Sequence, residues 1–166
     1  IVYMTYDISP EGLDKVYQAL EVTPSGNVAI KLSTGEAGNP NHLDPYLIKD
    51  LVQSVDGTIV ECNTAYSGSR RAETEMHMQV AEDHGFTEIA DVDIMDRDGY
   101  MKIPVTDGTN LQENWVGMNL ANYDYVIVLT HFKGHPMAGF GGALKNISIG
   151  IASSEGKVRI HTGGVF

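Results

Sequence analysis

Short apolar stretches recur along the chain, and each is followed by a polar loop. The run Tyr125–Thr130 is almost entirely apolar and β-branched, which is typical of a strand buried on both faces of a sheet. Val28–Leu32 and Thr58–Cys62 are shorter runs of the same kind. The pattern therefore predicts three buried strands, each of which ends where polar residues begin.

Three other segments repeat apolar residues at the helical period of 3.6 residues. The first two are predicted to begin at Pro10 and Pro45, because each proline follows a residue that can cap a helix. The third passes through Met76 and ends at Gly85, where a glycine supplies a helix stop. We expect Met76 to pack in the core as part of a methionine stripe.

The remaining segments carry weaker patterns. Ile1–Ile8 alternates loosely and favours a strand. Val92–Met95 and Tyr100–Val105 flank an Asp-Gly pair, which is a signal for an antiparallel hairpin between these two segments. Thr106–Tyr123 has mixed polarity and is predicted to be irregular with a short helix.

The alternation of strands and helices predicts an α/β fold. We expect a three-layer, mostly parallel sheet with helices on both faces and a β-hairpin excursion. At 166 residues the chain is predicted to form a single α/β domain over residues 1–166. The order of the strands does not follow from this pattern.

Composition excludes several kinds of partner. The chain has 22 acidic against 11 basic residues and a formal net charge of −11, which argues against nucleic acid and against an anionic membrane surface. Cys62 is the single cysteine, so there is no intrachain disulfide and no paired-cysteine metal motif. No apolar run approaches the roughly 18 residues of a spanning helix, and no signal-peptide pattern appears. We expect a cytoplasmic location.

The loop His131–Asn146 is richest in reactive side chains. It holds two imidazoles, two ammonium groups and a carboxamide around four glycines, directly after the predicted strand Tyr125–Thr130. Ligands of open α/β sheets bind beyond the carboxyl ends of strands, so this loop is the predicted site. The alternative is structural: the glycines would serve only a tight turn and the histidines would be ordinary loop residues.

If the three buried strands are parallel neighbours, the polar loops that follow them converge at one edge of the sheet. These loops and strand ends hold five of the 11 basic residues of an acidic protein, which predicts an anionic ligand, either a carboxylate or a phosphate. For Arg70 and its neighbour Arg71 the alternative is that they merely begin a helix at the surface. The predicted binding residues are Lys31, Ser33, Thr34, Ser67, Ser69, Arg70, Lys133, Gly141, Gly142 and Asn146.

His131, His135 and Lys145 are the candidate catalytic residues. Each histidine suits a general base or a metal ligand, because imidazole titrates near neutrality. The local metal signature is incomplete, and Cys62 completes it only if the fold brings it close. Lys145 suits either a nucleophile with a lowered pKa or an anion clamp. The identity of any metal is left open.

The run His135–Asn146, with Thr130–Lys133 before it, resembles the domain-of-unknown-function 362 family. The resemblance extends to Val28–Lys31 and Thr58–Asn63 and covers most of residues 28–153. Many members carry a cysteine-rich, ferredoxin-like segment beyond this domain and are described as iron–sulfur binding. This chain lacks such cysteines. The resemblance therefore implies an iron–sulfur cluster only if the chain is a fragment of a longer protein with a C-terminal ferredoxin-like segment.

His135 and Lys145 also match a run in the nickel-pincer lactate racemase family, in which histidine, Ala-Gly-Phe, Gly-Gly and lysine follow in order. In that family the lysine holds the cofactor and the histidine is the acid–base catalyst. The resemblance implies the same roles for these two residues by analogy.

Two hypotheses for function follow. The first is a domain of an enzyme, such as an oxidoreductase, that binds an anionic small molecule or cofactor at the loop and acts in redox or acid–base chemistry. The second is a non-catalytic docking or electron-transfer domain of an iron–sulfur protein, with a ferredoxin-like module as its partner. The sequence leaves the cofactor unknown.

Overall fold

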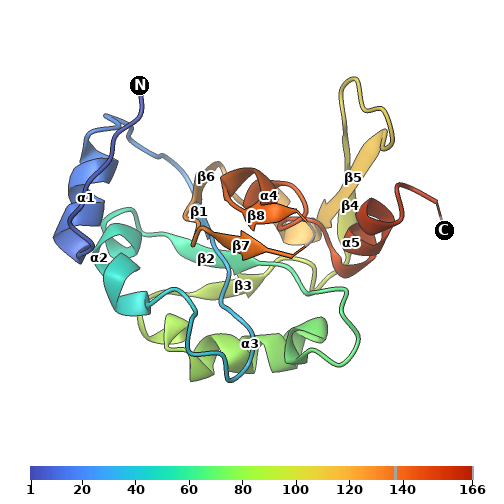
Figure 1. Ribbon diagram of the computed structural model, residues 1–166, viewed down its shortest axis with the longest axis horizontal. Helices are drawn as coiled ribbons and strands as arrows, with labels where there is room; N and C mark the ends of the chain where they lie inside the picture. Colours follow the sequence, from blue (N-terminus) through green and yellow to red (C-terminus); the bar gives the residue numbers. More distant parts are fainter. Residues whose placement is uncertain (137, 166) are drawn as a thin grey trace.

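The computed structural model describes residues 1–136 and 138–165 and has a parallel four-stranded sheet at its centre (Figure 1). The order is β3-β2-β1-β6, with β1 at Val28–Lys31, β2 at Thr58–Glu61, β3 at Val92–Ile94 and β6 at Tyr125–Val128. All three pairings are parallel. The predicted α/β class is therefore confirmed, and all three predicted strands are present; β1 and β2 are buried, whereas β6 lies at the edge of the sheet and is half-buried.

Successive residues of the strands face opposite sides of the sheet, and both sides are buried. Val28 and Ile30 pack with residues of α2 (Pro45–Ser54) and α3 (Thr74–Asp83). Ala29, between them, packs in a second cluster on the other side. Two separate cores of this kind make the three layers of the predicted fold.

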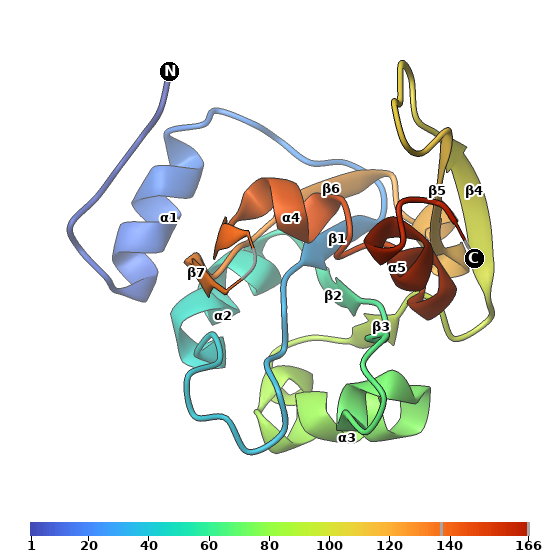
Figure 2. The ribbon, with the colours of Figure 1, turned by 45° about the vertical axis from the view of Figure 1, so that its right-hand side comes forward.

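The first core also receives α1 (Pro10–Gln18), which lies beside α2 (Figure 2). Ser9 caps α1 by accepting a hydrogen bond from the backbone N–H of Gly12, and Asp44 caps α2 through Tyr46. These are the capping residues that the sequence predicts, and both helices begin at the predicted proline.

The second core is covered by α4 (Ala143–Ile147), α5 (Ser154–His161) and the hairpin of β4 (Tyr100–Pro104) with β5 (Glu113–Gly117). Short 3₁₀ turns complete the chain: η1 at Arg70–Ala72, η2 at Phe86–Glu88 and η3 at Met118–Asn122. The β-hairpin excursion is thus present.

The strands of that hairpin differ from the prediction. β3 joins the central sheet in parallel with β2, and β4 pairs instead with β5, in the segment predicted to be irregular. Ile94 and Met95 are fully buried, and this burial favours a place in the central sheet over a surface hairpin. The Asp-Gly signal marks a turn between two sheets, with Gly99 at a φ of 106°.

Two other predictions are wrong. Ile1–Ile8 forms no strand and is exposed, and no described strand pairs with it. Met76 is 42% exposed, and the buried face of α3 is formed by His77, Val80 and Ala81. The prediction failed because helical spacing alone does not show which face of α3 is buried when the helix carries few other apolar residues.

The loop after β6 is more ordered than predicted. Lys133–His135 and Gly139–Gly141 pair as the antiparallel strands β7 and β8, and α4 follows directly. After α4 the chain turns tightly at Gly150, where an added Cβ would lie 2.1 Å from the carbonyl oxygen of Asn146. The chain therefore forms two separate helices here, α4 and α5.

Candidate functional site

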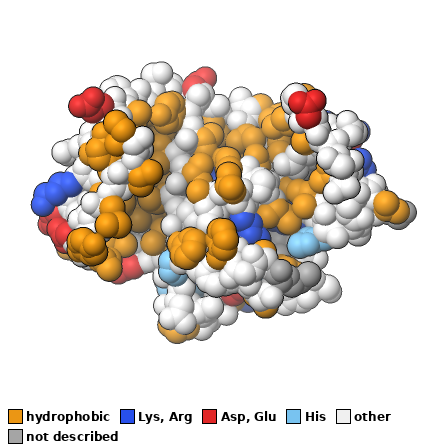
Figure 3. Space-filling model, turned by 45° about the horizontal axis from the view of Figure 1, so that its top comes forward, with side chains coloured by type: hydrophobic (Ala, Val, Ile, Leu, Met, Phe, Trp, Pro, Cys, Tyr) orange, Lys and Arg blue, Asp and Glu red, His pale blue; other side chains and the backbone are white. Residues whose placement is uncertain are grey.

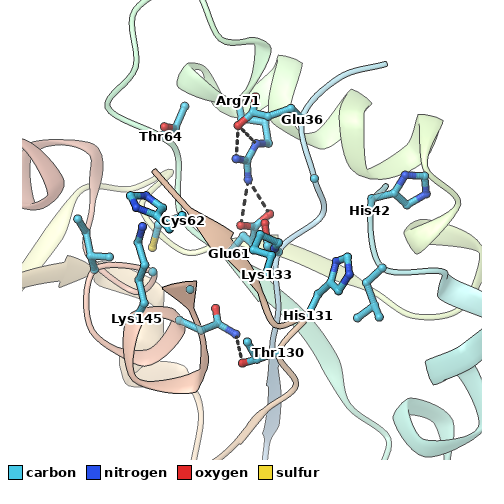
Figure 4. A pocket seen from close by; sticks show the side chains of 18 of the residues that line it. Glu36, His42, Glu61, Cys62, Thr64, Arg71, Thr130, His131, Lys133 and Lys145 are labelled. Carbon is cyan, nitrogen blue, oxygen red and sulfur yellow. Dashed lines mark hydrogen bonds and ion pairs between the residues drawn. The ribbon is translucent and has the colours of Figure 1, made fainter. Parts of the chain in front are cut away.

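A cavity of about 390 Å³ lies at the carboxyl ends of β1, β2 and β6. Its walls come from the loops that follow these strands, from the β7–β8 hairpin and from α4 and α5 (Figure 4). Counting lysine and arginine, five cations line it against two carboxylates. The cavity is therefore cationic, although the protein as a whole carries a net charge of −11.

Four of these cations form what we call the lysine cluster: Lys31, Lys133, Lys145 and Lys157. Within residues 1–136 and 138–165, none of the four makes an ion pair with a carboxylate. Burial lowers the pKa of each of them. A group of ammonium ions with lowered pKa values and without counter-ions is stabilised by a bound anion.

Lys31 is the most buried member of the cluster, with 1% of its surface exposed. Its Nζ donates to the carbonyl oxygen of Leu32 at 2.6 Å and to Oδ1 of Asn146 at 2.8 Å. Asn146 in turn donates to the carbonyl oxygen of Lys31 and to the hydroxyl of Thr130. Asn146 therefore ties α4 to the ends of β1 and β6.

The opposite wall is formed by Glu61 and Arg71, which Thr34 and His77 support from behind; we call these four residues the Glu61 cluster. Oε2 of Glu61 accepts hydrogen bonds from the backbone N–H and hydroxyl of Thr34 at 2.8 and 2.6 Å, and it lies 3.1 Å from Nε2 of His77. Oε1 lies 3.2 Å from the Arg71 guanidinium. Every carboxylate oxygen in this buried cluster thus has a partner.

These contacts fix the charge of Glu61. Burial alone would raise its pKa, but the charge of Arg71 and the hydrogen bond from His77 hold the pKa of this carboxyl well below its usual value. Arg71 also pairs with Glu36, so the guanidinium bridges two carboxylates (Figure 4). The Glu61 cluster is consequently balanced in charge, in contrast to the lysine cluster.

The two candidate histidines line the cavity and differ in their contacts. The backbone N–H of Ala138 donates to Nδ1 of His135 at 3.0 Å, so the proton of the neutral ring lies on Nε2. No hydrogen bond joins His131 to another described residue. Both rings are placed where they can exchange protons with a molecule in the cavity.

Most of the predicted residues line the cavity, but not all of them. The residues that do are Lys31, Ser33, Lys133, Gly141, Gly142 and Asn146, together with His131, His135 and Lys145. Thr34 does not line the cavity, and its hydroxyl donates a hydrogen bond to Glu61. Ser69 bonds to Glu36, Ser67 is exposed, and Arg70 pairs with Asp83 on the surface. Of the two neighbouring arginines, it is Arg71 that lines the cavity.

Sequence reasoning did not find Glu61, Lys157 or His42 as site residues, and it counted Arg71 only among the basic residues of the converging loops. A carboxylate within the apolar strand Thr58–Cys62 was a usable signal for Glu61, because an ionised side chain at a buried strand end requires partners. Lys157 gave no such signal, because it lies on α5, a helix that the apolar pattern did not predict.

The described residues do not fit an iron–sulfur cluster. Cys62 is buried, its thiol lies 3.2 Å from the carbonyl oxygen of Ile151, and burial raises its pKa to about 12. A cluster requires several thiolates. No group of three or more histidine, cysteine, aspartate or glutamate side chains is arranged for a metal ion in this part of the chain.

The fold and the cavity define a class: a parallel α/β domain with a cationic cavity at the carboxyl edge of its sheet. The chain matches the family described as "Domain of unknown function (DUF362)" over residues 28–165 and belongs to it. No curated protein and no solved structure matches the chain. The predicted family is confirmed, and its description assigns no activity.

The described helices also bear on the prediction that the chain has no membrane-spanning helix. None of them, over residues 1–136 and 138–165, combines the length and apolar character that crossing a membrane requires.

Proposed function

We propose that the cavity binds a small anionic molecule or cofactor and that its histidines serve acid–base chemistry on it. The observation that carries the proposal is the lysine cluster: four ammonium groups line one cavity without a carboxylate partner among the described residues. Such a site favours carboxylate or phosphate groups, because each is a strong acceptor for several charged donors.

The size of the cavity supports a small molecule. A volume of about 390 Å³ lies within the usual range of roughly 300–1,000 Å³ for ligand pockets. Arg71 is held by Glu36 and Glu61 and therefore contributes less to ligand binding than the unpaired lysines do. We expect Lys133 and Lys145, which are less buried than Lys31, to meet the ligand first.

Acid–base chemistry is part of the proposal because His131 and His135 line the same cavity as the lysine cluster. A neutral imidazole takes up a proton near pH 7 and returns it, which is the requirement for a general base. The proposal covers binding and proton transfer, and the redox alternative has no comparable support in the cavity's side chains.

The test is thermal unfolding of the full chain with phosphate, pyrophosphate, citrate or pyruvate at constant ionic strength. Pyrophosphate at 100 times its Kd is expected to stabilise the folded protein by about 2.7 kcal/mol. The Lys133→Ala/Lys145→Ala double variant should lose this stabilisation. Lys49→Ala removes an exposed lysine on α2 away from the cavity and should retain it.

Two results would contradict the proposal. Equal stabilisation of the double variant and Lys49→Ala would show a general effect of anions on the protein. A complete absence of stabilisation by every anion tested would show that the lysine cluster does not bind one.

A second candidate function, docking to a ferredoxin-like module, is favoured by exposed apolar side chains beside the cavity. Phe132, Phe140 and Leu144 are 68%, 60% and 86% exposed, and the two phenylalanine rings lie 5.6 Å apart. Figure 3 shows hydrophobic side chains gathered on this side of the molecule. An apolar surface of this kind is typical of an interaction site.

This second candidate is tested by NMR titration with a purified bacterial ferredoxin. Shifts confined to the neighbourhood of Phe132 and Phe140 are expected, and the Phe132→Ser/Phe140→Ser variant should abolish them. Unchanged spectra of the wild-type chain would contradict docking to a ferredoxin and would leave the anion proposal untouched.

A further inference from the structure

Lys31 is chemically unlike the other lysines of the chain. It is fully enclosed at the end of a central strand, yet its side chain lines the cavity. The partners of its Nζ are two neutral oxygens, the Leu32 carbonyl and the Asn146 amide. An ammonium ion carries three hydrogens and a full charge, so this environment satisfies it incompletely.

Such an environment favours the neutral amine. Burial lowers the pKa of Lys31 to about 8, with Glu61 and Cys62 opposing the shift and Lys157 and Arg71 adding to it. At pH 8 about half of the Lys31 side chains are then neutral, which is about a hundredfold more than for a lysine of ordinary pKa. A neutral amine has a lone pair and is a nucleophile.

The other residues of the cavity suit a particular kind of electrophile. The lysine cluster binds an anion, and a carbonyl group next to a carboxylate would be carried into the cavity with it. Desolvated lysines that meet carbonyl compounds in closed sites form imines. The combination points to one reaction at one atom.

We propose that Nζ of Lys31 forms an imine with a small 2-oxo acid that is held by its carboxylate in the lysine cluster. This inference rests on the proposed function, because it requires an anion in the cavity. It deepens that function by naming the substrate class and the residue that becomes covalently attached.

The reaction balances without an oxidant or reductant. The lone pair of Nζ forms the new C–N bond while the π pair of the C=O bond moves onto oxygen. Two protons reach that oxygen and release it as water while the nitrogen lone pair forms C=N, and Nζ gives up both of its hydrogens as protons in the process. The products are one imine and one water, and His131, which lines the same cavity, can carry these protons.

A purely structural role for Lys31 predicts something different. Its contacts with Leu32 and Asn146 join β1 to α4. A lysine that only made these structural contacts would not react with a ketone. Loss of stability in a Lys31 variant cannot separate the two roles. The test must therefore detect the covalent bond itself.

The experiment treats the full chain at pH 8 with pyruvate, 2-oxobutyrate or 2-oxoglutarate and then with sodium borohydride, which delivers hydride to the imine carbon. Intact mass should show a single reduced adduct, and peptide mapping should place it on Lys31. Labelling of Lys31 is expected to exceed that of the exposed Lys49 by at least about tenfold. Lactate, which lacks the ketone, should give no adduct.

Variants sharpen the assignment. Lys31→Met keeps the length of the side chain and should lose the adduct, whereas Lys49→Ala should retain it. If Lys31→Met does not fold, mapping of the wild-type adduct still decides the question. Unfolding the wild-type chain in urea before treatment should abolish the preference for Lys31, because the preference depends on the cavity.

Each remaining outcome overturns the inference. No adduct with any of the three 2-oxo acids, an adduct spread over exposed lysines, or one placed on Lys145 would each exclude an imine at Lys31. If pyrophosphate still stabilises the chain in those cases, anion binding stands and only the covalent step is wrong. If no anion stabilises the chain either, both proposals fail.

Discussion

The two walls of the cavity differ in whether their charged side chains have partners of opposite charge. In the Glu61 cluster each carboxylate oxygen has hydrogen-bonding or ionic partners, and Arg71 bridges Glu61 and Glu36. In the lysine cluster no carboxylate of the described residues forms an ion pair with an ammonium group, and the partners of Lys31 are neutral oxygens. One wall is complete as it stands, and the other is the wall at which we propose that an anion binds.

Under the proposed function, this difference separates the residues that stabilise the fold from those that bind the ligand. A buried ion pair that is fully satisfied contributes to a unique fold, and its removal is severe because the surviving charge stays buried. An unpaired cation does the reverse: it lowers the stability of the free protein and raises that of the complex. Substitutions in the two walls should therefore have opposite signatures.

The largest effect is expected for Glu61→Gln. The change keeps the shape of the side chain but leaves Arg71 and His77 facing a neutral amide in a buried place. The free energy of unfolding should fall by about 3 kcal/mol, measured by urea denaturation. Glu113→Gln, at a solvent-facing pair with Lys102, is the control and should leave the urea midpoint nearly unchanged.

Acid titration gives the sign of the Glu61 contribution. Because the folded pKa of Glu61 lies below its usual value of 4.5, its contribution to stability is present above pH 4.5 and is lost as the pH falls towards the folded pKa. The stability difference between wild type and Glu61→Gln should therefore shrink below pH 4.5. A difference that stayed constant down to pH 3 would mean that the charge of Glu61 is not what stabilises this wall.

The next effect concerns Lys31, whose charged form destabilises the folded protein, whereas the charged form of Glu61 stabilises it. Its pKa is about 8 in the folded chain and 10.5 in the unfolded one, so the unfolded state binds more protons between these values. Relative to Lys31→Met, wild-type stability should rise by about 2 kcal/mol between pH 8 and pH 10. Calorimetry across this range measures it, and parallel curves for the two proteins would contradict a desolvated amine.

Groups that face Lys31 do not reproduce this rise. Glu61 and Arg71 keep their charges through this range because their pKa values are shifted away from it, and the pKa of Cys62 is raised to about 12. The pKa of Lys157 is also lowered by burial, and its titration is common to both proteins of the comparison. The difference between the curves therefore isolates Lys31.

The location of the site was predictable because it depends on the direction of strands. Once Val28–Leu32, Thr58–Cys62 and Tyr125–Thr130 are parallel neighbours, the loops that follow them must meet, and the structure has this arrangement. The strand pattern is strongest for β1 and β2, which are buried in the middle of the sheet. Lys31 and Asn146, far apart in sequence, were for this reason predicted to share one site.

The division of the site into two walls was not predictable from the sequence. Adjacent residues on a 3₁₀ turn point in different directions, so nothing in the sequence distinguishes Arg71, which faces Glu61, from Arg70, which faces solvent. The role of Lys157 depends on α5, whose apolar pattern is too weak to predict a helix. Pairing of charges is a tertiary property, and local periodicity carries no information about it.

Asn146→Ala should have an intermediate effect, because the amide is the main support of the lysine wall. It removes the acceptor of Lys31 Nζ and two donated hydrogen bonds, to the Lys31 carbonyl and to Thr130. The free energy of unfolding should fall by about 1.5 kcal/mol in urea denaturation. Asn110→Ala in an exposed loop is the matched control, and equal effects of the two variants would show that Asn146 does not join α4 to the sheet.

The smallest effect is expected for Arg70→Ala, which tests whether the cavity distinguishes neighbouring arginines. Arg70 and Asp83 form an exposed ion pair in which each side chain is 46% exposed, so its loss should change the free energy of unfolding by at most about 0.5 kcal/mol. The affinity for pyrophosphate in isothermal titration calorimetry should equal that of wild type, because Arg70 lies outside the cavity lining. Weaker binding by the Arg70 variant would place this arginine in the ligand site and would end the distinction drawn between it and Arg71.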